Sequence, residues 1–198
     1  QPDAIKIGLL SNEKIVYAVS KSLKKVKTKK IILDPVIVST SGVKLISNKC
    51  ITALKKNLFR NISLLTPNIP EAKIFSGIDI KNVDDMILAA NKILKLGPKN
   101  VLIKGGHLDS NYIVDLLISK KFLKLYKNKK IRSKNTHGTG CTLSSAIATY
   151  YGCGKTLKKS CELGIRYVNN AIKTRPNFGK GNGPINHLNS FIIEKKFR

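Results

Sequence analysis

The sequence has no tryptophan, a single methionine and only 11 acidic residues among its 198. It also lacks any apolar run near the roughly 20 residues that a membrane-spanning helix needs, and residues 1–3 do not resemble a secretion signal. These absences exclude a transmembrane protein, and we expect a cytoplasmic location with no membrane partner. The apolar content of 42% is that of an ordinary globular protein, so we predict a single domain over residues 1–198.

The four cysteines do not have the paired spacing of a metal site, and disulfides are unfavourable in a reducing cytoplasm. Three of them lie in apolar or helical stretches, where a free cysteine acts as a small apolar side chain. We therefore interpret Cys50, Cys153 and Cys161 as packing residues. Cys141 differs, because it ends a Gly-Thr-Gly-Cys sequence at the start of an apolar helical pattern.

The shortage of acidic residues leaves a formal net charge of +26, which is a common property of nucleic-acid-binding proteins. However, five of the 37 basic residues are arginine, so 32 are lysine, and they are spread along the whole chain. Arginine is the preferred side chain for bidentate recognition of bases and phosphates. We therefore expect a solvated basic surface and no nucleic-acid partner, with a field that attracts anionic ligands.

Short β-rich segments alternate with longer helical patterns along the first half of the chain. The expected strands are residues 4–8, 31–34, 63–66 and 101–104, and the expected helices are residues 14–26, 48–59 and 83–96. This alternation predicts an α/β fold with a mostly parallel sheet covered by helices. Strand-like runs at 113–118, 121–126 and 129–132 predict an antiparallel edge hairpin, and two helices, 142–151 and 157–173, follow before a loop over 177–184.

Several polar segments follow the expected strands, where ligands bind in parallel α/β sheets. They are Asp34-Pro35-Val36, the segment from Thr66 to Glu71, and Lys104-Gly105-Gly106-His107. We expect them to converge on one rim together with the loop from Gly138 to Cys141. Lys104, beside two glycines that permit close backbone approach, could neutralise phosphate oxygens during a transfer reaction.

Two of these segments allow two interpretations. Asn68 and Glu71 lie three residues apart, so they can share a helical face and hold a hydrated Mg²⁺, or they can form the cap of a helix. Asp34 could face the metal or cap the next turn. For His107 and His137, which lie in glycine loops, we expect hydrogen bonds that shape the loop before any chemical role.

The segment from Asn135 to Thr142 combines a glycine-bent turn, a thiol and the start of a helix. Free backbone N–H groups and the positive end of the helix dipole favour an anion at such a position. The same environment lowers the pKa of a thiol, so Cys141 is a candidate general base. By contrast, Gly152-Cys153-Gly154-Lys155-Thr156 lacks the leading glycine of a phosphate-binding loop, and we interpret it as a helix end and a turn.

Taken together, these residues resemble the hydroxymethylpyrimidine/phosphomethylpyrimidine kinases of thiamine biosynthesis, a branch of the ribokinase-like superfamily. The resemblance runs along the whole chain in six segments of matching order and spacing. They are residues 6–10, Asp34-Pro35-Val36 with Ser41-Gly42, residues 65–72, 101–107, 135–142 and 179–184. The resemblance implies a ribokinase-like three-layer α/β/α fold, lacking the first strands, and ATP-dependent phosphorylation of the aminopyrimidine and then of its monophosphate.

The resemblance also implies residue roles. Cys141 would be the base that activates the acceptor oxygen, and the backbone of Gly138, Thr139 and Gly140 would form the anion hole for the transferred group. The remaining implied ligands are Lys104, Asn68 and Thr136 for ATP and its phosphates, Glu71 and Asp34 for Mg²⁺, and Val36 and Leu9 for the pyrimidine. Leu9 stands where members of this family commonly have methionine.

The chain departs from the resembled family at its front, where a strand and a glycine-rich pyrimidine-binding segment would be expected. We therefore expect an N-terminally truncated kinase domain, and an inactive remnant of such a kinase stays an alternative. A pyridoxal kinase-like enzyme is a second alternative, because related branches share the scaffold. The resemblance further implies a homodimer.

Overall fold

The structure is a computed structural model, and it describes residues 1–39, 42–108, 111–174, 176, 181 and 183–188. The chain divides into two compact units, Gln1–Lys130 and Ile131–Arg198. The single domain expected over residues 1–198 stays a prediction. Ser41 of the second matched segment, and Gly179, Lys180 and Asn182 of the last, lie outside the described residues.

The first unit holds a six-stranded sheet in the order β1-β2-β3-β4-β5-β6. Its strands are β1 (Ile5–Ile7), β2 (Ile31–Leu33), β3 (Leu64–Leu65), β4 (Asn100–Ile103), β5 (Tyr112–Ser119) and β6 (Leu123–Lys129). The first four are parallel, and β5 pairs with β4 and with β6 in antiparallel register. The mostly parallel sheet with an antiparallel edge hairpin is therefore confirmed.

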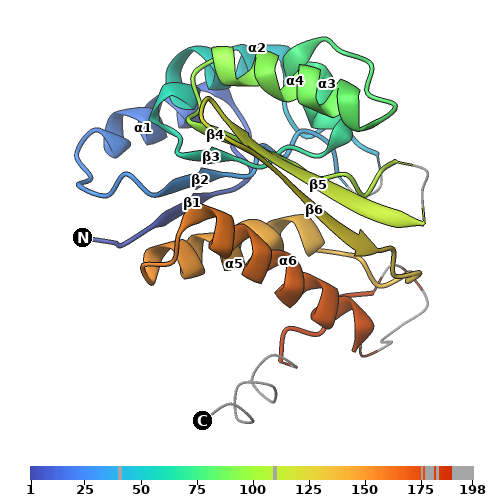
Figure 1. The fold of residues 1–198 in the computed structure, drawn as a ribbon. Coiled ribbons are helices and arrows are strands. Elements are labelled where there is room, and N and C mark those ends of the chain that lie inside the picture. Colours follow the sequence, from blue (N-terminus) through green and yellow to red (C-terminus); the bar gives the residue numbers. More distant parts are fainter. Residues whose placement is uncertain (40–41, 109–110, 175, 177–180, 182, 189–198) are drawn as a thin grey trace. The chain divides into compact units, whose positions relative to one another are not determined.

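The helices of the first unit lie on one face of this sheet (Figure 1). They are α1 (Glu13–Leu23), α2 (Asn48–Ala53), η1 (Leu54–Leu58), η2 (Phe59–Asn61), α3 (Ile69–Ser76) and α4 (Val83–Lys95). Polar caps define several starts: the Asn12 side chain accepts from the Ile15 N–H, and the Asn82 side chain from the Asp85 N–H. Their apolar faces pack on the alternate strand residues that point toward them, such as Leu33, Leu65 and Ile103.

Two expected elements of the first unit differ in the structure. The helix expected over residues 48–59 is α-helical only to Ala53 and continues as the π-helical η1 and the 3₁₀-helical η2. The third strand-like run, residues 129–132, is not a strand: Lys129 ends β6, and the rest has no ladder. The run has a single apolar residue, Ile131, and it is too short to build a strand without a neighbour to pair with.

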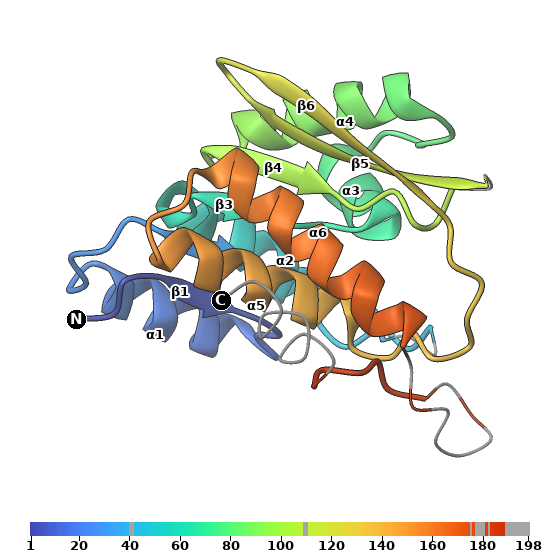
Figure 2. The same ribbon diagram turned by 60° about the horizontal axis from the view of Figure 1, so that its bottom comes forward.

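The described part of the second unit contains two helices, α5 (Thr139–Gly152) and α6 (Leu157–Lys173), which lie side by side (Figure 2). A Cβ at Gly164 would lie 2.8 Å from Ile147 and 3.4 Å from Leu143, so this glycine allows α6 to approach α5 closely. The segment between the helices is the predicted helix end and turn, with Gly154 at φ 84° and Thr156 capping α6. Among the described residues, no helix has the length and apolar character needed to cross a bilayer.

The cysteines agree with the expectation in two of three cases. Cys50 and Cys161 are buried, as predicted for packing residues. The interpretation of Cys153 as a packing residue is wrong, because its thiol is exposed at the C-cap of α5. A helical stretch before Cys153 does not bury its side chain, because the helix ends at this residue.

Candidate active site

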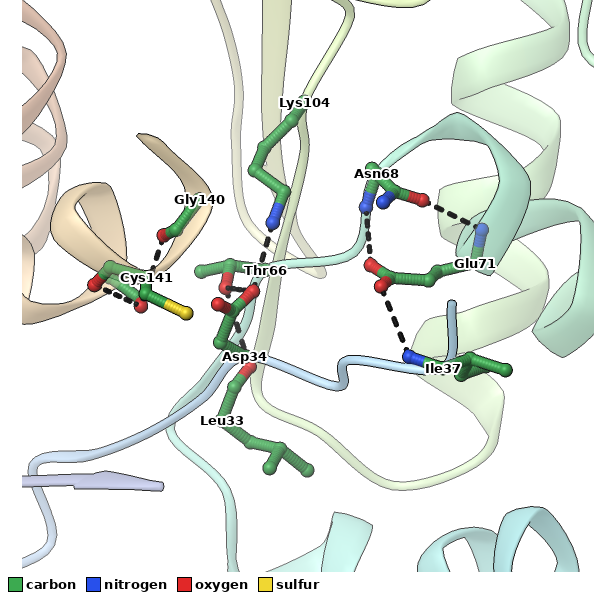
Figure 3. A network of polar contacts seen from close by, with 10 residues as sticks. Leu33, Asp34, Ile37, Thr66, Asn68, Glu71, Lys104, Gly140 and Cys141 are labelled. Atoms are coloured by element: carbon green, nitrogen blue, oxygen red, sulfur yellow. Dashed lines mark hydrogen bonds and ion pairs between the residues drawn. The ribbon is translucent and has the colours of Figure 1, made fainter. Parts of the chain in front are cut away.

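Polar side chains of the first unit gather where β2, β3 and β4 end (Figure 3). The Lys104 ammonium lies 2.8 Å from Oδ1 of Asp34, and the Thr66 hydroxyl donates to the same oxygen at 3.3 Å. Asp34 and Thr66 are buried, whereas the Lys104 side chain is 15% exposed. The rim therefore carries a lysine whose side chain is partly exposed and whose ammonium is paired with a buried carboxylate.

Glu71 and Asn68 form a complete cap at the start of α3. The Asn68 side chain accepts the Glu71 N–H at 2.9 Å, and Glu71 Oε2 accepts the Asn68 N–H at 2.8 Å. The other carboxylate oxygen, Oε1, accepts the N–H of Ile37 at 3.3 Å, which ties α3 to the segment after β2. The capping interpretation of this pair is therefore confirmed, and the role of Glu71 and Asn68 as ligands stays a prediction.

The charges of the rim act on one another. Burial raises the pKa of Glu71, and the negative charge of Asp34 adds to this, while Lys104 and the two backbone N–H groups oppose it. His107, in the loop after Lys104, has a pKa lowered by burial and by the positive charges of Lys104 and Lys130. The charge of Lys104 thus lowers the pKa of both Glu71 and His107.

One residue of this region was not expected from the sequence. Asp115 lies on β5, is buried, and accepts the N–H of Gly105 at 2.9 Å. Burial raises its pKa to about 6, against the opposing effects of the Gly105 N–H and Lys104. The signal in the sequence was an acidic residue inside an otherwise apolar strand pattern, Ile113 to Ile118.

The two residues expected to contact a pyrimidine follow the first two strands. Leu9 comes after β1 and is 47% exposed, and Val36 comes after β2 and is half-buried. The Val36 N–H donates to the Asp34 carbonyl at 2.9 Å, so its position depends on the turn that begins at Asp34. Their contact with a substrate stays a prediction.

The second unit supplies the glycine-rich loop. Gly138 is the N-cap of α5 at φ 82°, a conformation that other residues adopt only with strain, and it has no side chain to cap the helix. The helix begins at Thr139, earlier than the expected residue 142, so Thr139, Gly140 and Cys141 form its first turn. The Thr139 N–H donates to the Thr136 carbonyl at 3.3 Å.

Further hydrogen bonds hold the first turn of α5 and the loop that precedes it. The Ser144 hydroxyl donates to the carbonyl oxygen of Cys141 at 2.9 Å and also lies 3.2 Å from that of Gly140. The buried Asn135 accepts the Gly183 N–H at 3.1 Å, and the His137 N–H donates to the Gly183 carbonyl at 3.3 Å. The backbone of His137 therefore shapes the loop, while Thr136 and the Cys141 thiol are exposed.

The acidic residues of the first unit could supply only a few protein ligands to a metal ion. Within the described part of the chain, no three His, Cys, Asp or Glu side chains come together in a way that could hold an ion. Asp34 and Glu71 are two buried carboxylates of the same rim. Such a pair suits a cation that keeps most of its water and takes further oxygens from a ligand, as Mg²⁺ does.

A family model described as phosphomethylpyrimidine kinase matches residues 1–186. The chain is 39% identical over 186 residues to the thiamine biosynthesis bifunctional protein ThiED of Geobacter sulfurreducens, covering 94% of this chain and 38% of that protein. It is 43% identical over 177 residues to the hydroxymethylpyrimidine/phosphomethylpyrimidine kinase of Aquifex aeolicus, covering 89% of this chain and 69% of that enzyme.

Solved structures give a similar result. The chain matches the crystal structure of an ADP complex of Bacillus subtilis pyridoxal kinase with a TM-score of 0.88 and 32% identity. The match covers 96% of this chain and 72% of that structure. The α/β fold class expected from the sequence is therefore confirmed.

Proposed function

Because this chain belongs to the phosphomethylpyrimidine kinase family, we propose that it carries out ATP-dependent phosphorylation of 4-amino-5-hydroxymethyl-2-methylpyrimidine and then of its monophosphate. The observation that carries the proposal is the Lys104 and Asp34 pair at the ends of β4 and β2. Phosphoryl transfer places negative charge on the oxygens of the moving group, and catalysis consists mainly of positioning and of neutralising that charge. A partly exposed ammonium, held by a buried acid, suits this task.

Cys141 is the proposed general base. Its thiolate would take the proton of the substrate hydroxyl while the new bond forms between that oxygen and the γ-phosphorus, and the bond from phosphorus to the bridging oxygen of ADP breaks. The proton rests on Sγ and ADP leaves. The backbone of Gly138, Thr139 and Gly140 would meet the oxygens of the transferred group, as expected for the start of a helix.

We propose Mg²⁺ as the second cofactor beside ATP, held through Asp34 and Glu71. When bound, the ion would neutralise phosphate oxygens of the nucleotide. Both carboxylates already accept hydrogen bonds, from Lys104 and from backbone N–H groups. Each carboxylate oxygen has a second lone pair, so contact through the water of a hydrated ion is compatible with these bonds. Asn68, Lys104 and Thr136 are the proposed contacts to ATP.

The proposal is tested by ADP release from the purified full chain with each pyrimidine in turn. We expect turnover with the hydroxymethyl compound and with its monophosphate, and loss of both in Cys141→Ala. Cys153→Ala is the matched control, since its thiol is also exposed and lies at the other end of the same helix. Failure of both pyrimidines to raise ADP release above the Cys141→Ala level would contradict the proposal.

A pyridoxal kinase activity is the second candidate, favoured by the similarity to the Bacillus subtilis enzyme. The ratio of kcat/KM for pyridoxal to that for the hydroxymethylpyrimidine separates the two. We also propose a homodimer, from the resemblance alone, and sedimentation equilibrium of the active protein would test it.

A further inference from the structure

Asp115 is a carboxylate in the interior of an apolar strand. It is 6% exposed, and its neighbours on β5, Leu116 and Leu117, are fully buried. An ionisable group in such a place lowers stability unless its bonds compensate for lost hydration. The carboxylate accepts a hydrogen bond from a backbone group, the Gly105 N–H, at 2.9 Å. The carboxylate thus serves the turn that follows β4.

Gly105 leaves no room for a side chain against β5. A Cβ at this position would lie 2.9 Å from the carbonyl carbon of Val114 and closer still to its oxygen. The backbone after Lys104 therefore lies directly on the β5 backbone. At this point the antiparallel ladder has ended, since its last pair is Ile103 with Leu116. The Asp115 side chain supplies the acceptor that the ladder no longer provides.

Lys104 is consequently held on two sides. On the β3 side its own N–H donates to the Pro67 carbonyl at 2.9 Å. On the β5 side the next N–H, that of Gly105, is held by Asp115. The ammonium then reaches Asp34. The peptide that carries Lys104 is fixed between two neighbouring strands before any ligand binds.

We propose that Asp115 is a positioning residue, which holds the peptide between Lys104 and Gly105 so that the Lys104 ammonium is placed for phosphoryl transfer. This role rests on the function proposed above. It assigns to a residue of the antiparallel hairpin a task in the chemistry of the parallel part of the sheet. Asp115 acts through Lys104 and is not itself a ligand of the substrate.

The charge of Asp115 is part of this role. A hydrogen bond to an ionised acceptor is about twice as strong as a neutral one. Asparagine keeps a neutral acceptor for the Gly105 N–H, and alanine removes it. Asparagine also removes the unfavourable burial of a charge. The proposal therefore predicts different orders for two properties: activity should fall from Asp to Asn to Ala, whereas stability at pH 8 should be at least as high with Asn as with Asp.

The titratable and charged groups around Asp115 decide how its ionisation can be recognised in a pH profile. Lys104 is the charged neighbour from β4, and the buried Tyr126 is the cross-strand partner on β6. Burial raises the Asp115 pKa to about 6. His107, on the loop beyond Gly105, is a second titratable group here, with a pKa lowered by burial and by the charges of Lys104 and Lys130. A limb of the pH profile near 6 must therefore survive in His107→Gln to be assigned to Asp115.

The experiment measures kcat, KM and thermal midpoint for Asp115→Asn and Asp115→Ala, with Asp79→Asn as control. Asp79 is an exposed carboxylate paired with Lys73 and Lys81. We expect kcat at pH 8 to fall about tenfold in Asp115→Asn and about a hundredfold in Asp115→Ala, with the KM for the pyrimidine unchanged. The acidic limb near pH 6 should be present in the parent and in His107→Gln and absent in Asp115→Asn.

An unchanged kcat in Asp115→Asn, or a loss of activity that only follows a loss of folded protein, would overturn the proposal. A second measurement needs neither a variant nor substrate. In the parent protein the amide proton shift of Gly105 should titrate with a midpoint near 6, as its acceptor gains a proton. An absent titration overturns the positioning role, and it does so even if the chain phosphorylates no pyrimidine, so the two proposals fail separately.

Discussion

The Lys104 ammonium and the Asp34 carboxylate, 2.8 Å apart, connect the ends of two strands that are not neighbours in the sheet. β3 lies between them, and its last residue is followed by Thr66, whose hydroxyl donates to the same Asp34 oxygen. The residues that follow three adjacent parallel strands are thus joined by hydrogen bonds between their side chains. The ammonium that we propose for phosphate chemistry is also the counter-ion of a buried acid.

Removing that ammonium should destabilise the fold as well as stop the reaction. Lys104→Met leaves Asp34 buried without its partner, and we expect a loss of about 3 kcal/mol in the free energy of unfolding. The double variant Lys104→Met with Asp34→Asn should recover most of this stability and none of the activity. Urea denaturation followed by circular dichroism measures the difference.

Lys73→Met is the matched control, because Lys73 pairs with Asp79 where both side chains are exposed. Exposed ion pairs contribute little to stability, so the urea midpoint should hardly change. Equal losses in the Lys73 and Lys104 variants would show that the Asp34 pair is not a buried one.

Cys141→Ser should keep the fold and lose the general base. We expect kcat to fall by a factor on the order of 10² to 10⁴, with the KM for ATP unchanged, because a hydroxyl does not ionise near neutral pH. Initial-rate ADP release at saturating substrates gives the factor. A similar fall in Cys153→Ser, at the far end of α5, would assign the effect to helix stability and contradict a catalytic thiol.

The stability of the chain should depend on pH through Asp115. Its pKa of about 6 in the folded state lies above the ordinary value near 4, so the folded state binds more protons between these values. Its contribution is therefore fully present below pH 4 and is lost as the pH rises through 6, by about 3 kcal/mol in total. The difference in unfolding free energy between the parent and Asp115→Asn, measured from pH 4 to 8, gives the contribution of Asp115 protonation to stability. A difference that does not change with pH would contradict it.

Gly105→Ala and Gly106→Ala form a matched pair of neighbouring glycines. A Cβ at 105 collides with the Val114 carbonyl, whereas at 106 the nearest atom beyond the adjoining residues, Cδ1 of Ile113, is 4.0 Å away. We expect Gly105→Ala to lower the free energy of unfolding by about 3 kcal/mol or more, as overpacking does, and Gly106→Ala to change it little. Thermal melts of both variants provide the comparison, and equal midpoints would refute the close approach of Gly105 to the β5 backbone.

The sequence predicted the order and type of most elements because alternation and helical periodicity are local signals. It failed where tertiary packing decides. Residues 48–59 have a helical pattern, yet the helix changes its winding at Leu54, where η1 begins and contacts α1. Cys153 follows a helical stretch and was expected to pack, but its side chain is exposed because α5 ends there.

For the site, the segments after β2, β3 and β4 were predicted to meet, and within the first unit they do. The pairing of Lys104 with Asp34 could not be predicted, because it joins residues 70 positions apart and depends on the order of the strands. Asp115 was overlooked because its partner is a backbone N–H, which carries no signature in the sequence. The capping interpretation of Glu71 is confirmed, and its role as a metal ligand stays a prediction, which the cap does not oppose because a carboxylate oxygen that accepts one hydrogen bond keeps a second lone pair.

The bond from the Ile37 N–H to Glu71 has a thermodynamic consequence. Glu71 closes the first turn of α3 with one oxygen and holds the segment after β2 with the other. Any ligand that moves the backbone at Ile37 therefore changes the free energy of the α3 cap, and fraying of that cap must in turn change the affinity for the ligand by the same factor. Through Glu71, the position of the segment that contains Val36 and the stability of the first turn of α3 therefore depend on each other.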